Sequence, residues 1–353
     1  MKRIISLLLV FAMIGTFTAC GKNQKDQNEI VNKTIEFTDS LGRSVRIPEK
    51  PEKIALSGPV AQIVCFALCP DKLVGTALAW SDRTKELGLV SEKYMNLPVL
   101  GQLHGGMGNM NPEALLSAGA QLVIDIGEAK KDLAIELDDL QLQLGIPIVH
   151  IDCHTDNMSE VYEILGKLTG MENEAAKIAE YIENVCGGIL ETASGIEKKS
   201  AVWLLNNGQN VIAKGSYHSE IIDVLADNAA VIESPSSKGT GNILDREQLL
   251  LWDPEYIFAD NAETKQSLTD DPALRALSAV KSGNIYVVPD APYCWFGTPP
   301  SVQRILGMLW ASQILYPDAF GSDLYTRIAE YFNIFYHTEL SEEQYNALVF
   351  CSD

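Results

Sequence analysis

Residues 171–198 read MENEAAKIAEYIENVCGGILETASGIEK, and this stretch decides the fold. Its small and apolar residues fall three and four positions apart, with Glu and Lys between them: Ala175, Ile178, Ala179, Ile182, Val185, Ile189 and Ala193. That spacing places them on one face of an α-helix. Gly187 and Gly188 are poor helix formers and could bend it. The stretch therefore predicts one long amphipathic helix.

On both sides of this helix, short apolar runs alternate with helical patterns. The runs that precede it are residues 54–56, 73–76, 122–124 and 148–151, and those that follow it are residues 201–205, 211–213, 256–259 and 285–288. Buried strands separated by helices indicate a parallel sheet covered on both faces. The predicted fold class is α/β: two doubly wound α/β lobes joined by a single long helix, with a ligand cleft between the lobes. Its parts are an N-terminal lobe (34–170), a linker helix (171–198) and a C-terminal lobe (199–353).

Two further patterns refine this prediction. Residues 35–48 alternate with period two around Leu41-Gly42, which is typical of a β-hairpin. Residues 111–116 (NPEALL) lead to an apolar pair at 123–124, and residues 245–250 (DREQLL) lead to one at 257–258. When Glu113 is aligned on Glu247, the paired leucines and the later apolar pairs coincide. Each lobe is therefore expected to contain the same helix-to-strand unit.

The first residues are typical of a targeting signal. Lys2 and Arg3 precede a largely apolar stretch, residues 4–17, which as a helix spans about 21 Å, short of the roughly 30 Å hydrocarbon core. We therefore expect a signal peptide over residues 1–19. Residues 17–21 resemble the lipobox of bacterial lipoproteins, although that pattern prefers Leu where this chain has Phe17. Cleavage before Cys20 would leave a lipidated cysteine and a polar tether over residues 20–33.

Composition and charge exclude several functions. The chain has 353 residues, about two domains by length, with 46% hydrophobic and 21% charged residues, which is ordinary for globular proteins. Its net charge of −20 repels phosphate backbones and anionic lipid headgroups. We therefore expect no nucleic-acid partner, and membrane attachment through the N-terminal lipid only.

No compact catalytic motif occurs in the sequence. GxGxxG, Walker A, HExxH, GxSxG and kinase signatures are all missing, so the chain is predicted not to be an enzyme and to carry no cofactor. Apart from Cys20, the cysteines contain no CxxC pair, which favours buried free thiols over disulfides and gives a metal site little support. These cysteines are Cys65, Cys69, Cys153, Cys186, Cys294 and Cys351.

Candidate ligand-binding residues lie in loops that follow predicted strands, because ligands of open α/β sheets bind beyond the carboxyl ends of the strands. In the first lobe they are Ser57, Gly58, Gln62, Trp80, His104 and Glu128. In the second lobe they are Lys214, Tyr217, His218, Lys238, Thr240, Tyr293, Trp295, Phe296 and Arg304. Each has a purely structural alternative: the glycine-rich loops as turns, the histidines as solvated or capping groups, the Trp295-Phe296 pair as packing, and the cations as surface charges.

The order of several motifs resembles one protein family. These are residues 37–43 with Ile47-Pro48, then 111–116, 145–149, 271–274, 279–286, 309–310 and 315–317. Together they are similar to the bacterial ABC-transporter solute-binding proteins of the iron-siderophore, haem and cobalamin class, the class III periplasmic binding proteins with a helical backbone. No single motif is decisive, but their order along the chain is.

The resemblance implies an architecture and partners. It implies two lobes on one rigid helix with a small hinge motion, an extracytoplasmic and monomeric protein, and docking on an ABC permease dimer with its ATPase. By motif, Glu113 and Glu247 look like the glutamates with which relatives contact arginines of the permease. Both could instead be helix N-terminal acids, which the helix dipole stabilises by about 0.3–1 kcal/mol.

The sequence does not decide the identity of the ligand. An iron complex (siderophore or haem) or cobalamin comes first on family frequency, with His104, Tyr217, His218 and Tyr293 as candidate haem ligands and Trp80, Tyr293, Trp295 and Phe296 as aromatic contacts for cobalamin. The chain has only eight Arg, fewer than an arginine-lined siderophore cleft suggests. The alternative is a small oxyanion such as molybdate or tungstate, for which Ser57, Ser216 and Thr240 could supply donors. More distant alternatives are a metal-cluster enzyme subunit, which needs cysteines on loops, and a sensor lipoprotein.

Overall fold

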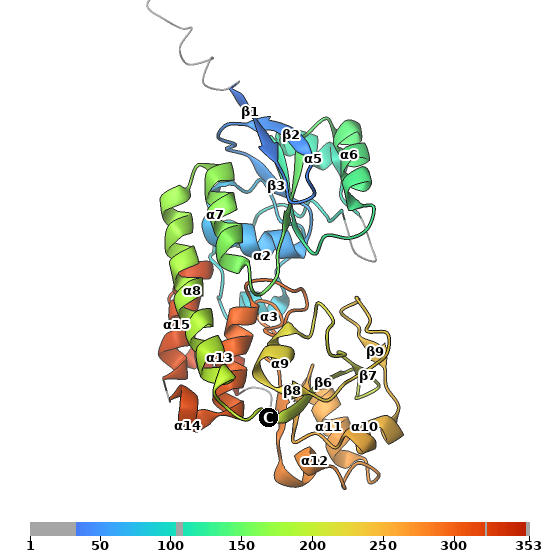
Figure 1. Cartoon of the computed structure of the whole chain (residues 1–353). Helices are drawn as coiled ribbons and strands as arrows, with labels where there is room; N and C mark the ends of the chain where they lie inside the picture. The colour runs from blue at the N-terminus through green and yellow to red at the C-terminus, as the bar shows by residue number, and fades with distance from the viewer. Residues whose placement is uncertain (1–32, 104–108, 322, 351–353) are drawn as a thin grey trace, which may run out of the picture. The chain divides into compact units, whose positions relative to one another are not determined.

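A computed structural model describes residues 33–103, 109–321 and 323–350. The expected signal peptide, Cys20, nearly all of the tether, His104 and Cys351 lie outside these residues. The described residues form two β-sheets of mostly parallel strands, with one long helix between them in sequence, and a separate two-stranded sheet (Figure 1). The structure is thus α/β, as predicted.

The first sheet is fully parallel. Its strands, in the order β3-β4-β5, are β3 (Ile54–Leu56), β4 (Leu122–Gly127) and β5 (Ile148–Asp152). Ile54 pairs with Leu122, and Val123 pairs with Ile148. The predicted strand at 73–76 forms only isolated parallel bridges, Leu73 to Ile54 and Thr76 to Val99, because its two ends pair with different segments.

The predicted hairpin is confirmed. β1 (Thr34–Thr38) and β2 (Ser44–Pro48) form a two-stranded sheet. In the turn between them the Asp39 carboxylate accepts hydrogen bonds from the backbone N–H groups of Leu41 and Arg43. The Arg43 guanidinium donates to Asp39 and, over 2.7 Å, to the carbonyl of Ile148. These bonds attach the turn to β5.

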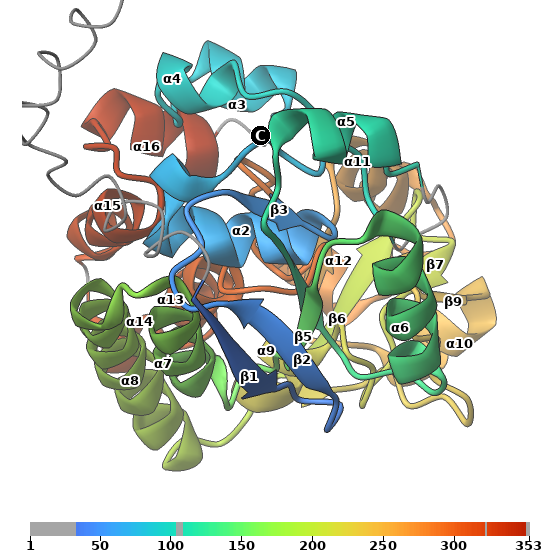
Figure 2. The same ribbon diagram turned by 90° about the horizontal axis from the view of Figure 1, so that it is seen from above.

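Helices cover both faces of the first sheet. They are α2 (Pro59–Leu68), the 3-10 turn η2 (Pro70–Lys72), α3 (Asp82–Glu86), α4 (Glu92–Met95), α5 (Pro112–Ala118), α6 (Leu133–Leu144) and α7 (Met158–Thr169). Because strand side chains alternate, Ile54 and Leu56 join the core on the α2 and α7 side, whereas Ala55 joins the core under α5 and α6. Figure 2 shows α5 and α6 across the sheet from α7 and α8.

The long helix is α8 (Glu172–Ser194), and it packs against α7. Its buried residues include Ala175, Ile178, Ala179, Ile182, Ile189 and Ala193, as the periodicity predicts. Gly187 and Gly188 lie within the helix and are exposed. A Cβ at Gly166 of α7 would lie 2.7 Å from the Ala175 Cβ, so the two helices approach closely there because Gly166 has no side chain.

The second sheet is mixed. β11 (Ile285–Val287), β10 (Tyr256–Ala259), β6 (Ser200–Leu205) and β8 (Asp227–Asn228) are parallel, whereas β7 (Asn210–Val211) and β9 (Asn242–Ile243) form an antiparallel edge. The predicted strand at 211–213 is thus a short antiparallel one. Asn206, Asn207 and Gly208 all have positive φ and reverse the chain directly after β6, without a crossover helix.

Helices also cover both faces of the second sheet. α10 (Arg246–Trp252), α11 (Ala262–Asp270) and α12 (Ser278–Ser282) contribute to one core, and α9 (Glu220–Leu225) and α13 (Arg304–Leu315) to the other. α14 (Pro317–Phe320), α15 (Leu324–Phe335) and α16 (Glu342–Val349) follow. α15 packs on α2, and Gln344 of α16 donates to the Leu87 carbonyl, so the last helices contact the first half of the chain. The predicted lobe boundaries stay a prediction.

The predicted repeat corresponds to α5 followed by β4 and α10 followed by β10. The Asn111 side chain caps α5, and the Asp245 side chain caps α10. Leu115 and Leu249 occupy equivalent buried positions. Both halves therefore contain one helix-to-strand unit with a side-chain N-cap.

The described residues also show whether a helix could span a membrane and whether the cysteines are paired. Among the described helices, none is both long and apolar enough to cross a membrane. The cysteines that the structure describes, Cys65, Cys69, Cys153, Cys186 and Cys294, are free thiols. Burial raises the pKa of Cys153 to about 12, so this thiol is protonated at neutral pH.

Candidate ligand-binding site

The two halves contact each other where the loop after β5 meets the start of α9. We call this contact the junction: Cys153, His154 and Thr155 of the first half, with Tyr217, Glu220 and Arg304 of the second. The Tyr217 hydroxyl donates to the carbonyl of Cys153. The loop lies at the carboxyl end of the first sheet, the edge at which open α/β sheets bind ligands.

Glu220 lies at the centre of the junction. Its Oε2 accepts three hydrogen bonds: from the Thr155 N–H over 2.9 Å, from the Thr155 hydroxyl, and from Nη1 of Arg304 over 2.6 Å. Its Oε1 accepts a hydrogen bond from Nδ1 of His154 over 3.2 Å. Burial by itself would raise the pKa of Glu220, but Arg304 and these hydrogen bonds outweigh burial and lower it below its ordinary value. The carboxylate is therefore charged at neutral pH.

Arg304, a candidate ligand cation, is an internal group. Its residue is 1% exposed. Nη1 also bonds the Thr155 hydroxyl over 3.1 Å, Nη2 donates to the Tyr217 carbonyl, and the guanidinium lies 4.7 Å from the centre of the Tyr217 ring. Its Nε is buried without a hydrogen-bond partner. Glu220 thus neutralises the cation inside the protein.

Tyr217 and His218 lie beside these charges. The Tyr217 ring meets the His154 ring edge to face at 5.1 Å, and burial raises the pKa of its hydroxyl. His218 is buried, and its Nδ1 donates to the carbonyl of Gly297 over 2.9 Å. Burial lowers the pKa of His218, so its imidazole is neutral at pH 7. A Cβ at Gly239 would lie 3.3 Å from the ring, which shows how closely the 236–242 loop covers it.

Glu128 joins this group from the first half. It follows the last residue of β4 and is half-buried. Its negative charge acts to raise the pKa of both Tyr217 and His218, two residues of the second half. The structure therefore brings four sequence-predicted candidates, Glu128, Tyr217, His218 and Arg304, to one region.

Ser57 uses its hydroxyl within the first half, whereas Gln62 bonds both the first half and Tyr293 of the second. The Ser57 hydroxyl donates to Asp125, whose other carboxylate oxygen accepts Nδ1 of His150 over 2.7 Å. Gln62 accepts from the N–H groups of Ala77 and Leu78 and donates to the Tyr293 hydroxyl over 2.7 Å. Gly58, the residue before α2, is buried, and a Cβ there would meet open space.

The other aromatic candidates lie in the core. Trp80 packs edge to face on Phe66 at 5.2 Å and contacts Tyr293 at 5.8 Å. Trp295 and Phe296 are fully buried, with Phe296 at 4.9 Å from Phe258. Packing is therefore the role that the structure displays for Trp80, Trp295 and Phe296.

The remaining candidates are surface residues. Lys214 is exposed and pairs with Asp227 over 3.1 Å. Lys238 and Thr240 are exposed on the loop before β9. His104 lies outside the described residues.

Sequence reasoning missed His154, Thr155 and Glu220. His154 and Thr155 follow the strand predicted at 148–151, so the rule that selected the other loops could have selected them too. Glu220 lies two residues after the candidate loop 214–218 and begins α9. Its role depends on Thr155, 65 residues earlier, and a local pattern does not reveal such a partner.

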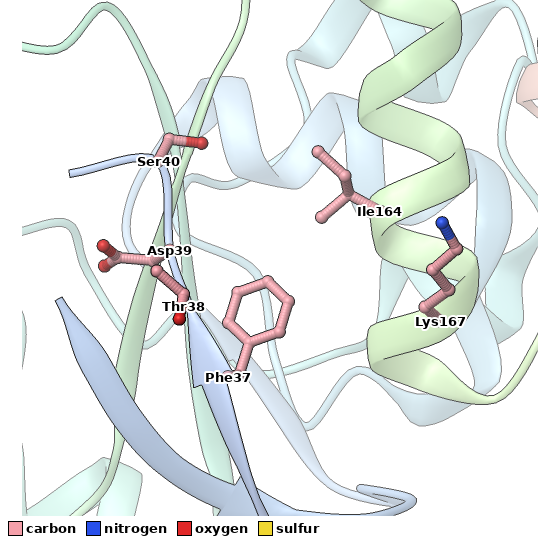
Figure 3. Close-up of a pocket in the computed structure, with 6 residues that line it drawn as sticks. All are labelled: Phe37, Thr38, Asp39, Ser40, Ile164 and Lys167. Atoms are coloured by element: carbon pink, nitrogen blue, oxygen red, sulfur yellow. The ribbon is translucent and has the colours of Figure 1, made fainter. Parts of the chain in front are cut away.

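A small pocket of about 180 Å³ lies elsewhere, between the hairpin and α7. Figure 3 shows the Phe37 ring and Ile164 beside it, with Lys167 on the α7 side. None of the predicted site residues lines this pocket, and its Asp39 carboxylate is bonded to Arg43. In the described part of the chain, no three His, Cys, Asp or Glu side chains gather as they would around a metal ion.

Paired α/β halves connected through one long helix are the architecture of two-lobe solute-binding proteins. The chain belongs to the periplasmic binding protein family, whose sequence profile matches residues 90–292. Members of this family bind solutes outside the cytoplasm for ABC transporters and are not enzymes. No curated protein matches the chain in sequence.

Solved structures agree on the fold. An ABC transporter solute binding protein from Sulfurospirillum deleyianum has a TM-score of 0.80 and 23% identity over 89% of this chain and 98% of its own. MolA, a molybdate periplasmic binding protein of Haemophilus influenzae, has a TM-score of 0.68 and 17% identity over 88% and 99%. The petrobactin-binding protein YclQ from Bacillus subtilis has a TM-score of 0.58 and 17% identity over 83% and 100%. Proteins of this one fold thus bind different ligands.

Proposed function

We propose that the chain is the binding component of an ABC importer and that it captures an iron complex, a siderophore or haem, or the tetrapyrrole complex cobalamin, and delivers it to the permease unaltered. The observation that carries this proposal is that Tyr217 and His218 of the second half lie beside His154 of the first half, with Glu128 near enough for its charge to act on both. Carboxylate, phenol and imidazole are oxygen and nitrogen donors of the kind that iron accepts.

The neutral state of His218 is compatible with a metal complex as the ligand, whereas burial keeps the Tyr217 phenol protonated. A neutral imidazole keeps a lone pair on one ring nitrogen, whereas an imidazolium has none; in the ligand-free fold the backbone of both Gly297 and Ser237 hydrogen-bonds the His218 ring. Arg304 is already paired with Glu220 and is less available to a small free anion. Molybdate is the second candidate, because a relative with this fold binds it.

The ligand class is tested with a panel of probes. The purified full chain is mixed with haemin, cobalamin or a ferric catecholate complex and followed by visible absorption, while molybdate is followed by thermal unfolding. We expect a saturable spectral change with one coloured probe, weakened by Tyr217→Phe. Tyr325→Phe is the matched control, because Tyr325 also donates to a backbone carbonyl, that of Leu340. Stabilisation by molybdate alone would replace the iron complex with the oxyanion.

We also propose that Glu113 and Glu247 contact the permease. Both are exposed in the first turns of α5 and α10. A helix joined by a short turn to the next strand runs antiparallel to it, so both glutamates lie towards the carboxyl ends of the sheets, the ligand-binding edge. Leu116 and Leu250, three residues further on, are 57% and 36% exposed. Matched carboxylates with apolar neighbours suit a partner that presents two similar basic surfaces.

Charge reversal tests this docking surface. Glu113→Arg and Glu247→Arg should each abolish uptake of the bound probe in cells while the affinity of the purified protein stays unchanged. Glu263→Arg, at an exposed glutamate of α11, should leave uptake intact. Normal uptake by both docking variants would refute the proposal.

The third proposal concerns the membrane anchor. We propose that Cys20 carries a lipid that holds the protein at the outer side of the cell membrane and that the mature protein is monomeric. Cys20→Ser should release the protein from the membrane fraction, and mass spectrometry of the wild type should find a lipidated Cys20 peptide. A Cys20→Ser protein that stays with the membrane would contradict this anchor.

A further inference from the structure

Glu220 connects elements of both halves through one carboxylate. The residues that bond it in the first half, His154 and Thr155, lie in the loop after β5. In the second half it pairs with Arg304, the first residue of α13, while Glu220 itself begins α9.

The charges make this contact strong. Hydrogen bonds between ionised groups are about twice as strong as neutral ones, and Glu220 is ionised beside a buried guanidinium. Arg304 already has one buried N–H without a partner. Without the carboxylate, the partners described for this charge would all be neutral: the Thr155 hydroxyl and the carbonyl and ring of Tyr217. Arg304 and the 153–155 loop therefore both depend on Glu220.

We propose that Glu220 is a positioning residue for ligand capture: it fixes the 153–155 loop of the first half against α9 and α13 of the second, and so sets the spacing of the halves beside Glu128, Tyr217 and His218. This inference rests on the proposed binding function. Glu220 touches no ligand in this account, and acts through Thr155 and Arg304.

The rest of the fold does not depend on this carboxylate. One continuous hydrophobic core includes residues of α2, α8, α13 and α15 and holds the two halves together independently. Loss of Glu220 should thus loosen the junction while the sheets stay intact. If Glu220 only stabilised the second half, its removal would instead lower the hydrogen-exchange protection of β6 and β10.

Hydrogen exchange of the ligand-free full chain distinguishes these roles. In Glu220→Gln we expect the Thr155 amide, which donates to this carboxylate, to exchange about ten-fold faster, the loss expected for one hydrogen bond to a charged group. The Cys153 and His154 amides donate to Gly127 and Asn157 and should change less. Amides of β6 and β10 should keep their protection. Glu263→Gln, which neutralises an exposed glutamate of α11, should change neither region. Thr155→Val should raise the amide exchange rate of the loop similarly. The double variant should exchange no faster than Glu220→Gln.

Two results would overturn the inference. One is unchanged exchange of the Thr155 amide in Glu220→Gln, and the other is an equal loss of protection in β6. Because these measurements use no ligand, they stand even if the proposed ligand class is wrong. With a coloured probe that binds the wild type, Glu220→Gln should release it about ten-fold faster, and Glu220→Asp, which keeps the charge, should recover part of the difference. Release at the wild-type rate would also count against the role.

Discussion

At the residue scale, Arg304 illustrates how burial decides what a candidate ligand residue can do. The sequence indicates a cation beside the aromatic loop 293–300. Its partners, Glu220 and Thr155, lie 84 and 149 residues earlier in the chain. Only the folded chain brings them together, so residue type alone could not distinguish a ligand-binding cation from an internally paired one.

The pH dependence of stability tests the Glu220–Arg304 pair. The pKa of Glu220 is lowered from its ordinary value of 4.5 in the folded protein, so its stabilising contribution is present above pH 4.5 and is lost as the pH falls through the lowered pKa. Thermal unfolding should find the wild type more stable than Glu220→Gln at pH 7, with the difference shrinking below pH 4.5. A difference that is independent of pH would contradict this ionisation.

At the scale of elements, sequence patterns correctly predicted those helices and turns that are stabilised by residues close together in the sequence. The period of α8, the hairpin turn at Asp39–Arg43 and the two capped helices α5 and α10 all follow from neighbours in the sequence. The antiparallel edge β7–β9 and the isolated bridges at Leu73 and Thr76 depend on distant partners. Apolar runs alone therefore could not specify them.

Two glycines test the packing of α7 on α8. Gly166→Ala should destabilise the protein by about 1–3 kcal/mol, because the new Cβ would lie 2.7 Å from that of Ala175. Gly187→Ala meets no atom within 4 Å and should stabilise the exposed helix by about 0.5–1 kcal/mol. Urea unfolding measures both. Similar effects of the two substitutions would show that the helices do not pack as described.

At the scale of the whole molecule, the α/β class, the linker helix and the family were all predictable, because each depends on patterns repeated along the chain. Which residues bind the ligand stays a prediction. The charge of Glu128 reaches Tyr217 and His218, whereas Trp80, Trp295 and Phe296 pack in the core. An aromatic residue after a strand can contact a ligand or pack in the core, and only the folded structure distinguishes these two roles.

The most direct test of the account is a binding titration that uses one residue from each half. A ferric catecholate complex is titrated into the wild type and into Glu128→Gln, His218→Gln and their double variant, with visible absorption as the readout. The account predicts one-to-one saturation of the wild type, about ten-fold weaker binding in each single variant, and recovery of the complex unchanged. Wild-type affinity in the double variant would contradict a ligand held between the two halves at this site.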